Sequence, residues 1–357
     1  MSTSVALAVQ ARVPVLLWGA PGTGKTSYIL ALGQALGLPV EVVIASIREP
    51  ADFAGLPIIS GEGVIMAPPA WARRLAVAGR GILFLDEIST APPAVQAALL
   101  RVVLDRVVGD LALPEGVAVI AAANPPEQAA GGWDLAAPLA NRFCHLSWGL
   151  DPQAWVEGML RGWPAPAVPV LPAGWEAGIP AARALVAAFI RHRPHLLLQV
   201  PREEAEASRA WPSPRTWDMA ARLLAAADAA QAGDDVAASL VVGCVGEGAG
   251  LEFLAWRQSL DLPDPESVLA DPGHLQLSGR GDRDFAVLAA VASAAVRNLT
   301  RERWLAAWAI LARAAEQGGK DVAAAAARSL AAARRPDLPL PVKELREFLP
   351  LLQKAEG

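Results

Sequence analysis

Four short runs of apolar residues recur in the first part of the chain, with segments of helical periodicity between them. They span residues 13–18, 40–44, 81–87 and 117–124. Because each run is continuously apolar rather than alternating with polar residues, it is typical of a strand buried on both faces. Strands separated by helices predict an α/β fold, a parallel sheet between layers of helices. Ligands of such sheets bind beyond the carboxyl ends of the strands, so polar residues at those ends are candidate site residues.

A glycine-rich stretch follows the first run and fits the pattern G-x-x-x-x-G-K-[ST] at the start of a predicted helix. It reads Gly19-Ala20-Pro21-Gly22-Thr23-Gly24-Lys25-Thr26-Ser27. Gly22 and Gly24 allow the backbone N–H groups to curl around phosphate oxygens, and the helix start adds its positive dipole end. We expect Lys25 to reach the β and γ phosphates and the Thr26 hydroxyl to ligate Mg²⁺. The stretch therefore predicts a phosphate-binding loop.

Two later runs end in polar residues that suit phosphoryl transfer. Asp86 and Glu87 close the third run, and Asn124 closes the fourth. This acidic pair resembles a Walker B element, in which Asp holds Mg²⁺ and Glu orients and deprotonates the attacking water. Alone, such a pair often only caps the next helix, but the phosphate loop upstream favours the catalytic interpretation. Asn124 fits a contact to the γ-phosphate or its attacking water, and it also fits a turn before proline.

These motifs, in this order, resemble those of MoxR-type AAA+ ATPases over residues 5–225. The resemblance rests on residues 19–26, 82–89, 91–100, 124–125, 141–143 and 213–215. It implies an AAA+ P-loop core with a helical lid and a hexameric ring in which ATP and Mg²⁺ bind between neighbouring subunits. It also implies that Asn124 is sensor 1, Arg142 the arginine finger that reaches a neighbour's γ-phosphate, and Arg215 the sensor 2 residue of the lid.

The identity of the finger is open at this stage. Arg101 and Arg106 are rival interface cations because they lie on the helix that follows the acidic pair. The family pattern commonly has Asp before the finger, whereas Asn141 precedes Arg142 here. An arginine supplied by a neighbour would make hydrolysis depend on assembly. Arg215 is predicted in the first turn of a helix that Ser213 caps and Pro214 begins.

Two predicted β-hairpins are inserted in the core. Residues 55–66 form the first around a Ser-Gly-Glu-Gly turn, and residues 107–116 form the second. The resemblance implies that the first faces a central pore, and that the ring remodels or activates a client together with a von Willebrand factor A domain protein. Neither insert carries a basic side chain, although Arg106 directly precedes the second. This argues against the alternative of a nucleic-acid motor, and the intact acidic pair argues against a scaffold that binds ATP with little turnover.

The rest of the chain predicts two helical regions after the core. We divide it into an α/β nucleotide-binding core at residues 1–150, a proline-rich linker with the helical lid at 151–272, and a C-terminal helical extension at 273–357. The net charge of −5 argues against nonspecific nucleic-acid binding as the main task of the protein. The longest apolar stretch, residues 285–296, is too short for a membrane span, and no charged leader is evident. With two distant cysteines, a cytoplasmic protein is expected.

Overall fold

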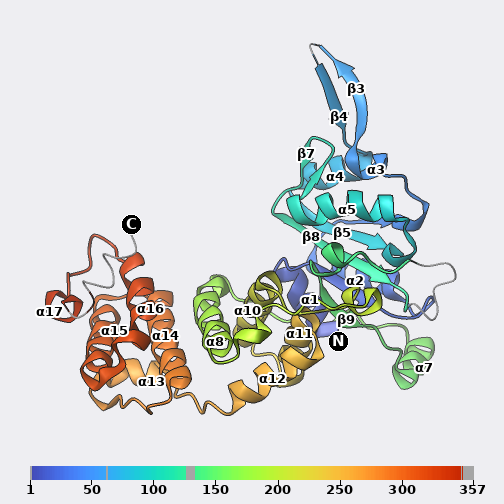
Figure 1. Ribbon diagram of the computed structural model, residues 1–357. Helices are drawn as coiled ribbons and strands as arrows, with labels where there is room; N and C mark the ends of the chain where they lie inside the picture. The colour runs from blue at the N-terminus through green and yellow to red at the C-terminus, as the bar shows by residue number, and fades with distance from the viewer. Residues whose placement is uncertain (1, 62, 126–132, 347, 349–357) are drawn as a thin grey trace. The chain divides into compact units, whose positions relative to one another are not determined.

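The computed structural model describes residues 2–61, 63–125, 133–346 and 348 (Figure 1). The chain folds into two compact units. One comprises Met1–Leu171 and Leu198–Leu251, and the other Pro172–Leu197 and Glu252–Gly357. The predicted segment 151–272 is therefore distributed over both units, whereas the predicted extension at 273–357 lies wholly in the second unit. Among the described residues, no helix is both long and apolar enough to cross a bilayer.

The first unit is built on a five-stranded parallel sheet, which confirms the predicted fold class. Its order is β2-β5-β8-β1-β9. The strands are β1 (Val15–Trp18), β2 (Val40–Ile44), β5 (Arg80–Asp86), β8 (Gly116–Ala123) and β9 (Cys144–Ser147). In register, Val15 of β1 lies beside Ile120 of β8 on one side and Cys144 of β9 on the other. Because all pairs are parallel, the carboxyl ends of the strands meet at one edge.

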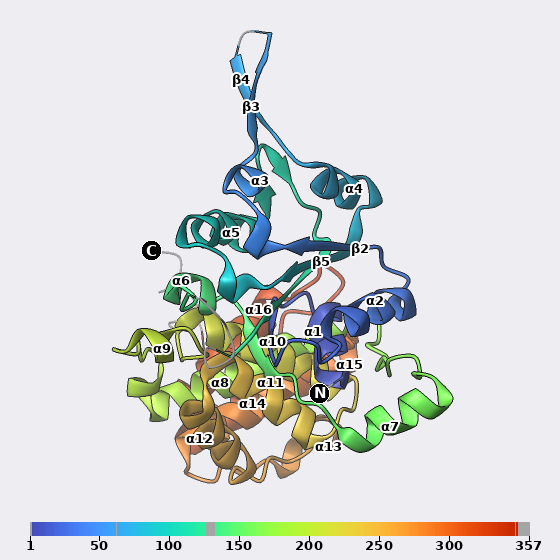
Figure 2. The same cartoon turned by 90° about the vertical axis from the view of Figure 1, so that its right-hand side faces the viewer.

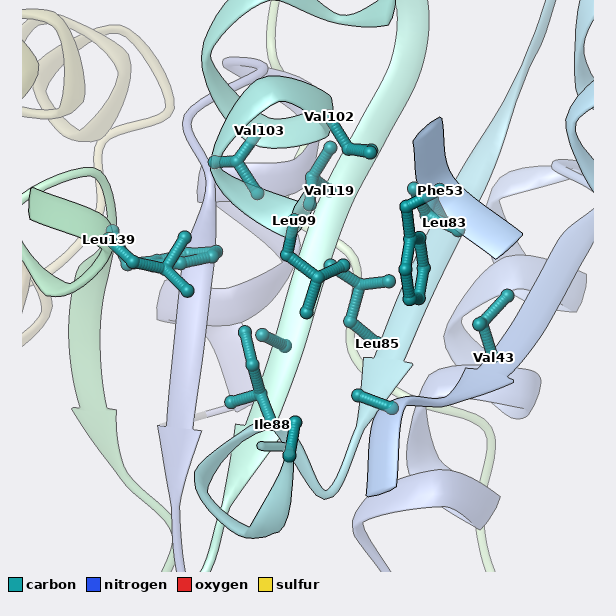
Figure 3. Close-up of a cluster of buried hydrophobic side chains, with 14 of the residues drawn as sticks. Val43, Phe53, Leu83, Leu85, Ile88, Leu99, Val102, Val103, Val119 and Leu139 are labelled. Carbon is teal, nitrogen blue, oxygen red and sulfur yellow. The ribbon is translucent and has the colours of Figure 1, made fainter. Parts of the chain in front are cut away.

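Helices cover both faces of this sheet. Leu83, Leu85 and Val119 pack with Leu99 and Val102 of α5 (Pro93–Asp105) in one buried cluster (Figure 3). Alternate strand residues face the opposite way, and they too are buried, among them Leu17, Phe84 and Ile120. On the sheet also pack α1 (Ser2–Gln10), α2 (Lys25–Leu36) and α4 (Ala70–Ala78). This two-sided burial explains the apolar runs of β1, β5 and β8. The expectation is wrong for residues 40–44, since β2 contains Glu41 and only its Val43 is buried.

Both predicted hairpins are present. The first pairs β3 (Leu56–Ser60) with β4 (Gly63–Ala67) and projects from the body of the unit beyond α3 (Ala51–Ala54) (Figures 1 and 2). The second pairs β6 (Val107–Val108) with β7 (Leu111–Ala112). The turn of the second fixes the base of the first, because Asp110 N donates to Met66 O at 2.9 Å and Asp110 Oδ2 accepts from Met66 N at 2.7 Å. The predicted turn residue Glu62 lies outside the described residues.

Short helices complete the first unit. They are α6 (Ala137–Ala140), α7 (Pro152–Arg161), α9 (Glu204–Ala207), α10 (Pro214–Ala229), α11 (Asp234–Val245) and the beginning of α12 (Glu247–Gln258). Single turns of 3-10 helix follow β2 at η1 (Ala45–Ile47) and β5 at η2 (Ile88–Thr90). Helix α10 begins as expected, with Ser213 as the N-cap of a capping box and Pro214 in the first turn.

The described residues of the second unit form only helices and connecting segments. It contains α8 (Ile179–His192), α13 (Pro265–Ala270), α14 (Gly281–Arg297), α15 (Arg301–Ala314), α16 (Lys320–Ala332) and α17 (Val342–Leu345), with short turns at η4 (Trp175–Gly178), η5 (Pro194–Leu196), η6 (Pro272–His274) and η7 (Ala315–Gly319). Trp304 and Trp308 are fully buried in its core, with ring centroids 5.8 Å apart. The sequence predicts a last helix over residues 342–352. Helix α17 covers its start, and residues 347 and 349–352 lie outside the described part.

Candidate nucleotide-binding site

The glycine-rich stretch forms the turn between β1 and α2. Gly22 and Gly24 have φ angles of 76° and 85°, in the left-handed region that favours glycine. A Cβ at either position would meet nothing within 4 Å, so the backbone conformation, and not crowding, requires glycine there. Lys25 is the first residue of α2, with its backbone at the positive end of the helix. The loop therefore has the curled backbone and helix start that phosphate oxygens require.

The Lys25 side chain is held inside the loop. Its Nζ donates to the carbonyl oxygens of Gly19 at 2.7 Å and Ala20 at 2.9 Å, and to Asn124 Oδ1 at 3.4 Å. Burial lowers the pKa of Lys25, and the charges of Asp86 and Glu87 oppose this shift. A buried ammonium group that bonds only to neutral oxygens is a strong electrostatic partner for an anion.

The acidic pair lies directly beside the loop. Thr26 Oγ1 donates to Asp86 Oδ2 at 2.8 Å, while the backbone N–H of Glu87 donates to Asp86 Oδ1 at 3.0 Å. Glu87 has a φ of 56°, which is unusual for a non-glycine residue and turns the chain away from β5. Its carboxylate Oε2 accepts a 2.5 Å hydrogen bond from the hydroxyl of Ser46. Asp86 thus faces Thr26, and Glu87 is oriented toward the residues that follow β2.

Asn124 completes this cluster at the end of β8. Its backbone N–H donates to Ser89 Oγ at 3.2 Å, and its side-chain oxygen is the one that Lys25 contacts. The structure therefore brings Lys25, Thr26, the acidic pair and Asn124 together at the carboxyl edge of the sheet, as the sequence predicts from the ends of the strands.

Arg142 follows α6, and Arg215 lies in the first turn of α10. Among the described residues, no hydrogen bond or ion pair joins either arginine to the phosphate loop. Arg142 is half-buried, its Nη1 donates to Pro138 O, and its Nε has no hydrogen-bond partner in the described part of the chain. Burial lowers the pKa of Arg142, the positive charge of Arg215 lowers it further, and Asp105 opposes the shift. The two arginines are therefore close enough to repel each other.

The rival cations are placed differently. Arg101 is exposed on α5. Arg106 bends back on its own subunit, where Nη2 donates to Pro114 O at 2.7 Å and Val117 O at 2.5 Å. Burial lowers the pKa of Arg106. Its guanidinium is thus engaged in holding the second hairpin to β8.

Some residues around the loop carry no sequence signal that would have identified them. Trp148, just after β9, donates from Nε1 to Thr23 O at 3.1 Å and stacks obliquely on Tyr28, with ring centroids 4.8 Å apart. A Cβ at Gly19 would lie 2.6 Å from Trp148 O, so the first glycine of the motif is required for this close approach. Ser46 was likewise missed, because only the turn after β2 brings it to Glu87.

Two cavities of similar size differ in their relation to this site. One of about 510 Å³ lies in the first unit, and Trp18, which directly precedes the loop, is in its wall together with His145, Arg209, Ser4 and Asp235. The other, of about 490 Å³, lies in the second unit and contains none of the predicted site residues in its lining.

Comparison with known proteins agrees with this geometry. Residues 14–145 match the model of the ATPase family associated with various cellular activities (AAA). A stretch of 122 residues is 33% identical to the probable regulatory protein WtsA of a pathogenicity locus in Pantoea stewartii subsp. stewartii, and this match spans 32% of the present chain and 38% of that protein.

Solved structures give weaker likenesses. A candidate ATPase from Cytophaga hutchinsonii is 19% identical with a TM-score of 0.43, and the match covers 68% of this chain and 79% of that one. A full-length MCM homolog from Methanopyrus kandleri is 21% identical with a TM-score of 0.39, covering 68% and 54%. At these TM-scores neither likeness supports a statement about function. The match to the AAA family model therefore covers the segment that carries the phosphate loop, the acidic pair and Asn124.

Proposed function

We propose that this protein is a Mg²⁺-dependent ATP hydrolase of the MoxR type that assembles into a ring of six subunits and remodels a partner protein. The observation that carries this proposal is the convergence of Lys25, Asp86 and Asn124 on one loop. A chain that only stored nucleotide would have no need of Glu87 beside that loop. The cavity of about 510 Å³ next to Trp18 offers room for the nucleoside end of ATP.

The residues at the loop fit Mg²⁺. The Thr26 hydroxyl and the Asp86 carboxylate are hard oxygen ligands of the kind that Mg²⁺ prefers, and they lie 2.8 Å from each other. When bound, Mg²⁺ would neutralise charge on the phosphate oxygens. Lys25 contributes a second positive charge. Its ammonium group now donates to the carbonyl oxygens of Gly19 and Ala20, and in this proposal phosphate oxygens replace them.

In this proposal Glu87 is the general base, and Ser46 restrains it. The short Ser46 hydrogen bond holds the carboxylate in one direction, so the base becomes available to a water molecule only when that bond is released or lengthened. Asn124 would hold the water or the γ-phosphate, because its amide can donate to either.

Arg142 would act on the nucleotide of a neighbouring subunit. In the described part of the chain it makes no hydrogen bond or ion pair to its own loop, and the charge of Arg215 lowers its pKa, so we assign both cations to one region that a phosphate group would neutralise. The repulsion between them favours binding of an anion. This arrangement supports assembly into a ring, for which we propose six subunits, and it makes hydrolysis depend on contact between subunits.

The projecting hairpin is our candidate for contact with the client. Its largest exposed side chains are apolar, with Ile59 86% exposed and Val64 64% exposed. Residues 55–66 carry no basic side chain, which favours a protein client, with a von Willebrand factor A domain protein as partner, over a nucleic acid.

Two variants test the proposal directly. Lys25→Ala should lose binding of a fluorescent ATP analogue, while Glu87→Gln should keep it, lose phosphate release and stay assembled when ATP is present. Mass photometry of Glu87→Gln with ATP reports the assembly, and mass spectrometry of the proteins that co-purify with it reports the client. Wild-type turnover by Glu87→Gln would refute the assigned base, and undiminished ATP affinity of Lys25→Ala would refute the nucleotide site.

A further inference from the structure

His145 in β9 uses both of its ring nitrogens. Trp18 Nε1 donates to His145 Nδ1 at 2.9 Å, and His145 Nε2 lies 2.9 Å from Ala140 O. An indole N–H can only donate, so Nδ1 carries no proton. A carbonyl oxygen can only accept, so Nε2 carries the proton. The two partners therefore fix His145 as one neutral tautomer.

These two partners belong to the two parts of the proposed machinery. Trp18 is the last residue of β1 and directly precedes Gly19 of the phosphate loop. Ala140 is the last residue of α6 and directly precedes Asn141 and Arg142. A single side chain thus bridges the strand that carries the loop and the segment that carries the finger.

The Ala140 carbonyl has a second role at this point. It accepts from Phe143 N at 3.1 Å, which closes a tight turn with Asn141 and Arg142 at its centre. The His145 N–H approaches the same oxygen and so anchors the turn to β9. Asn141 anchors the turn from another side, since its Oδ1 accepts from Ser213 Oγ at 2.8 Å.

We propose that His145 is a positioning residue for Arg142: its Nε2–H holds the carbonyl that closes the finger turn, and Trp18 selects the tautomer that can do so. The inference rests on the proposed function, in which Arg142 completes a neighbour's site. A change at Trp18 beside the phosphate loop is thereby transmitted to the finger turn through one imidazole ring. The hydrogen-bonded ring also holds the turn in place when no neighbour is bound.

Two amide replacements separate the two bonds of His145. In His145→Gln the longer side chain can still donate near the Nε2 position to Ala140 O, whereas in His145→Asn the shorter amide can face Trp18 but cannot reach Ala140. We expect His145→Gln to keep kcat within about threefold of wild type and His145→Asn to lose at least about tenfold, with ATP affinity unchanged in both. Equal kcat in the two variants would overturn the proposal.

A mixing experiment tells in which subunit His145 acts. Lys25→Ala cannot bind ATP but keeps an intact finger turn, so adding it to His145→Asn should restore hydrolysis at the His145→Asn sites. No recovery at any mixing ratio would mean that His145 acts on its own phosphate loop and would overturn the inference.

The tautomer itself provides a readout that does not depend on turnover. Side-chain ¹⁵N spectra of the wild-type protein should show His145 protonated at Nε2 only, and Trp18→Phe should lower the share of that tautomer, because only Ala140 O then favours it. Protonation at Nδ1 in the wild type would contradict the inference. The Glu87→Gln and Lys25→Ala experiments test the proposed function by themselves. A failure of the proposed function can therefore be told apart from a failure of the inference about His145.

Discussion

Asn141 accepts a hydrogen bond from the hydroxyl of Ser213 at 2.8 Å and donates one to the backbone carbonyl of Trp211 at 3.1 Å. The side chain is 4% exposed, so both bonds lie inside the protein. MoxR-type sequences commonly have Asp before the finger arginine. The carbonyl oxygen of Trp211 can only accept a hydrogen bond, so residue 141 must donate one, and a carboxylate has no proton to donate. The amide is therefore required by the way the finger turn docks against the start of α10.

Replacing Asn141 by Asp should destabilise the protein at neutral pH. The carboxylate would keep the Ser213 bond but face the Trp211 carbonyl oxygen without a proton between them. A buried acceptor left without a donor costs about 1–3 kcal/mol, and more when it is charged. Urea unfolding at pH 7 measures the loss relative to wild type.

The pH dependence of Asn141→Asp provides its own control. A carboxyl group in this position should have a raised pKa, and in its protonated form it can donate to Trp211 O. The destabilisation should therefore shrink as the pH falls toward 5. Ser213→Ala, which removes the hydroxyl partner and the N-cap of α10 but adds no carboxyl group, should show no such recovery. A loss for Asn141→Asp that stays constant with pH would contradict this explanation.

The sheet and the centre of the site could be predicted from the sequence because both follow from local patterns. Strands β1 and β8 and the centre of β5 are continuous apolar runs, β2 is apolar except for Glu41, and parallel strands place their carboxyl ends together. Once the phosphate loop fixes the edge at which the ligand lies, the polar residues after β5 and β8 must be near it. This is why Lys25, Asp86 and Asn124 were identified correctly as neighbours.

Other features depend on tertiary contacts that the sequence does not display. Strand β9 was not predicted, because Cys144-His145-Leu146-Ser147 is short and alternates polar with apolar residues at the sheet edge. Its His145 is accommodated only through Trp18 and Ala140. Helices α7 and α12 were missed as well. Asp151 caps α7 with its side chain, a signal that was available, whereas Gly248 and Gly250 obscure the helical pattern of α12.

Removing the Thr26 hydroxyl should abolish the effect of Mg²⁺ on nucleotide binding. In wild type we expect ATP to bind about tenfold to a hundredfold more tightly with Mg²⁺ than with EDTA. Thr26→Val keeps the shape of the side chain but removes the oxygen that donates to Asp86, so the two affinities should become similar. Thr26→Ser retains the hydroxyl and should behave as wild type. A full Mg²⁺ effect in Thr26→Val, measured by titration calorimetry, would rule out this ligand.

Arg142→Ala should bind ATP normally yet hydrolyse it about a thousandfold more slowly. Mixed with Lys25→Ala, which supplies an intact Arg142, it should regain part of the activity. Arg101→Ala, on the exposed face of α5, should keep wild-type turnover. Arg106→Ala should lower stability, because its side chain holds two carbonyl groups of its own subunit. Loss of turnover in Arg101→Ala with normal activity in Arg142→Ala would reassign the finger.

A charge on the projecting hairpin should impair client contact without affecting the fold. Ile59 is 86% exposed, so Ile59→Asp should change stability by no more than about 0.5 kcal/mol and leave basal ATP hydrolysis intact. Capture of the client by the Glu87→Gln ring should drop at least about tenfold when Ile59→Asp is added. Val77→Asp is a matched control, since Val77 is 91% exposed on α4 and lies outside the hairpin. Equal capture with both substitutions would exclude the hairpin as the contact surface.

Titration of His145 should make the first unit less stable in mild acid. Burial lowers the pKa of His145 to about 4, the Ala140 hydrogen bond opposes this shift, and the Arg209 charge adds to it. In the unfolded chain the same ring titrates near its ordinary value of about 6.5. Between these values the unfolded state binds the proton and the folded state does not, so stability contributed by neutral His145 is complete above about pH 6.5 and decreases as the pH falls toward 4.

The difference in pKa corresponds to a loss on the order of 3 kcal/mol over this range, as an upper limit because His145 as a residue is only partly buried. His145→Gln does not titrate there and keeps a donor for Ala140. Urea unfolding followed by tryptophan fluorescence at several pH values should therefore show a steeper loss for wild type than for His145→Gln between pH 6.5 and 4. Carboxyl groups titrate equally in both proteins and cancel in the comparison. Parallel curves would mean that His145 accepts a proton in the folded protein as readily as in the unfolded chain, and that Trp18 and Ala140 do not hold it neutral.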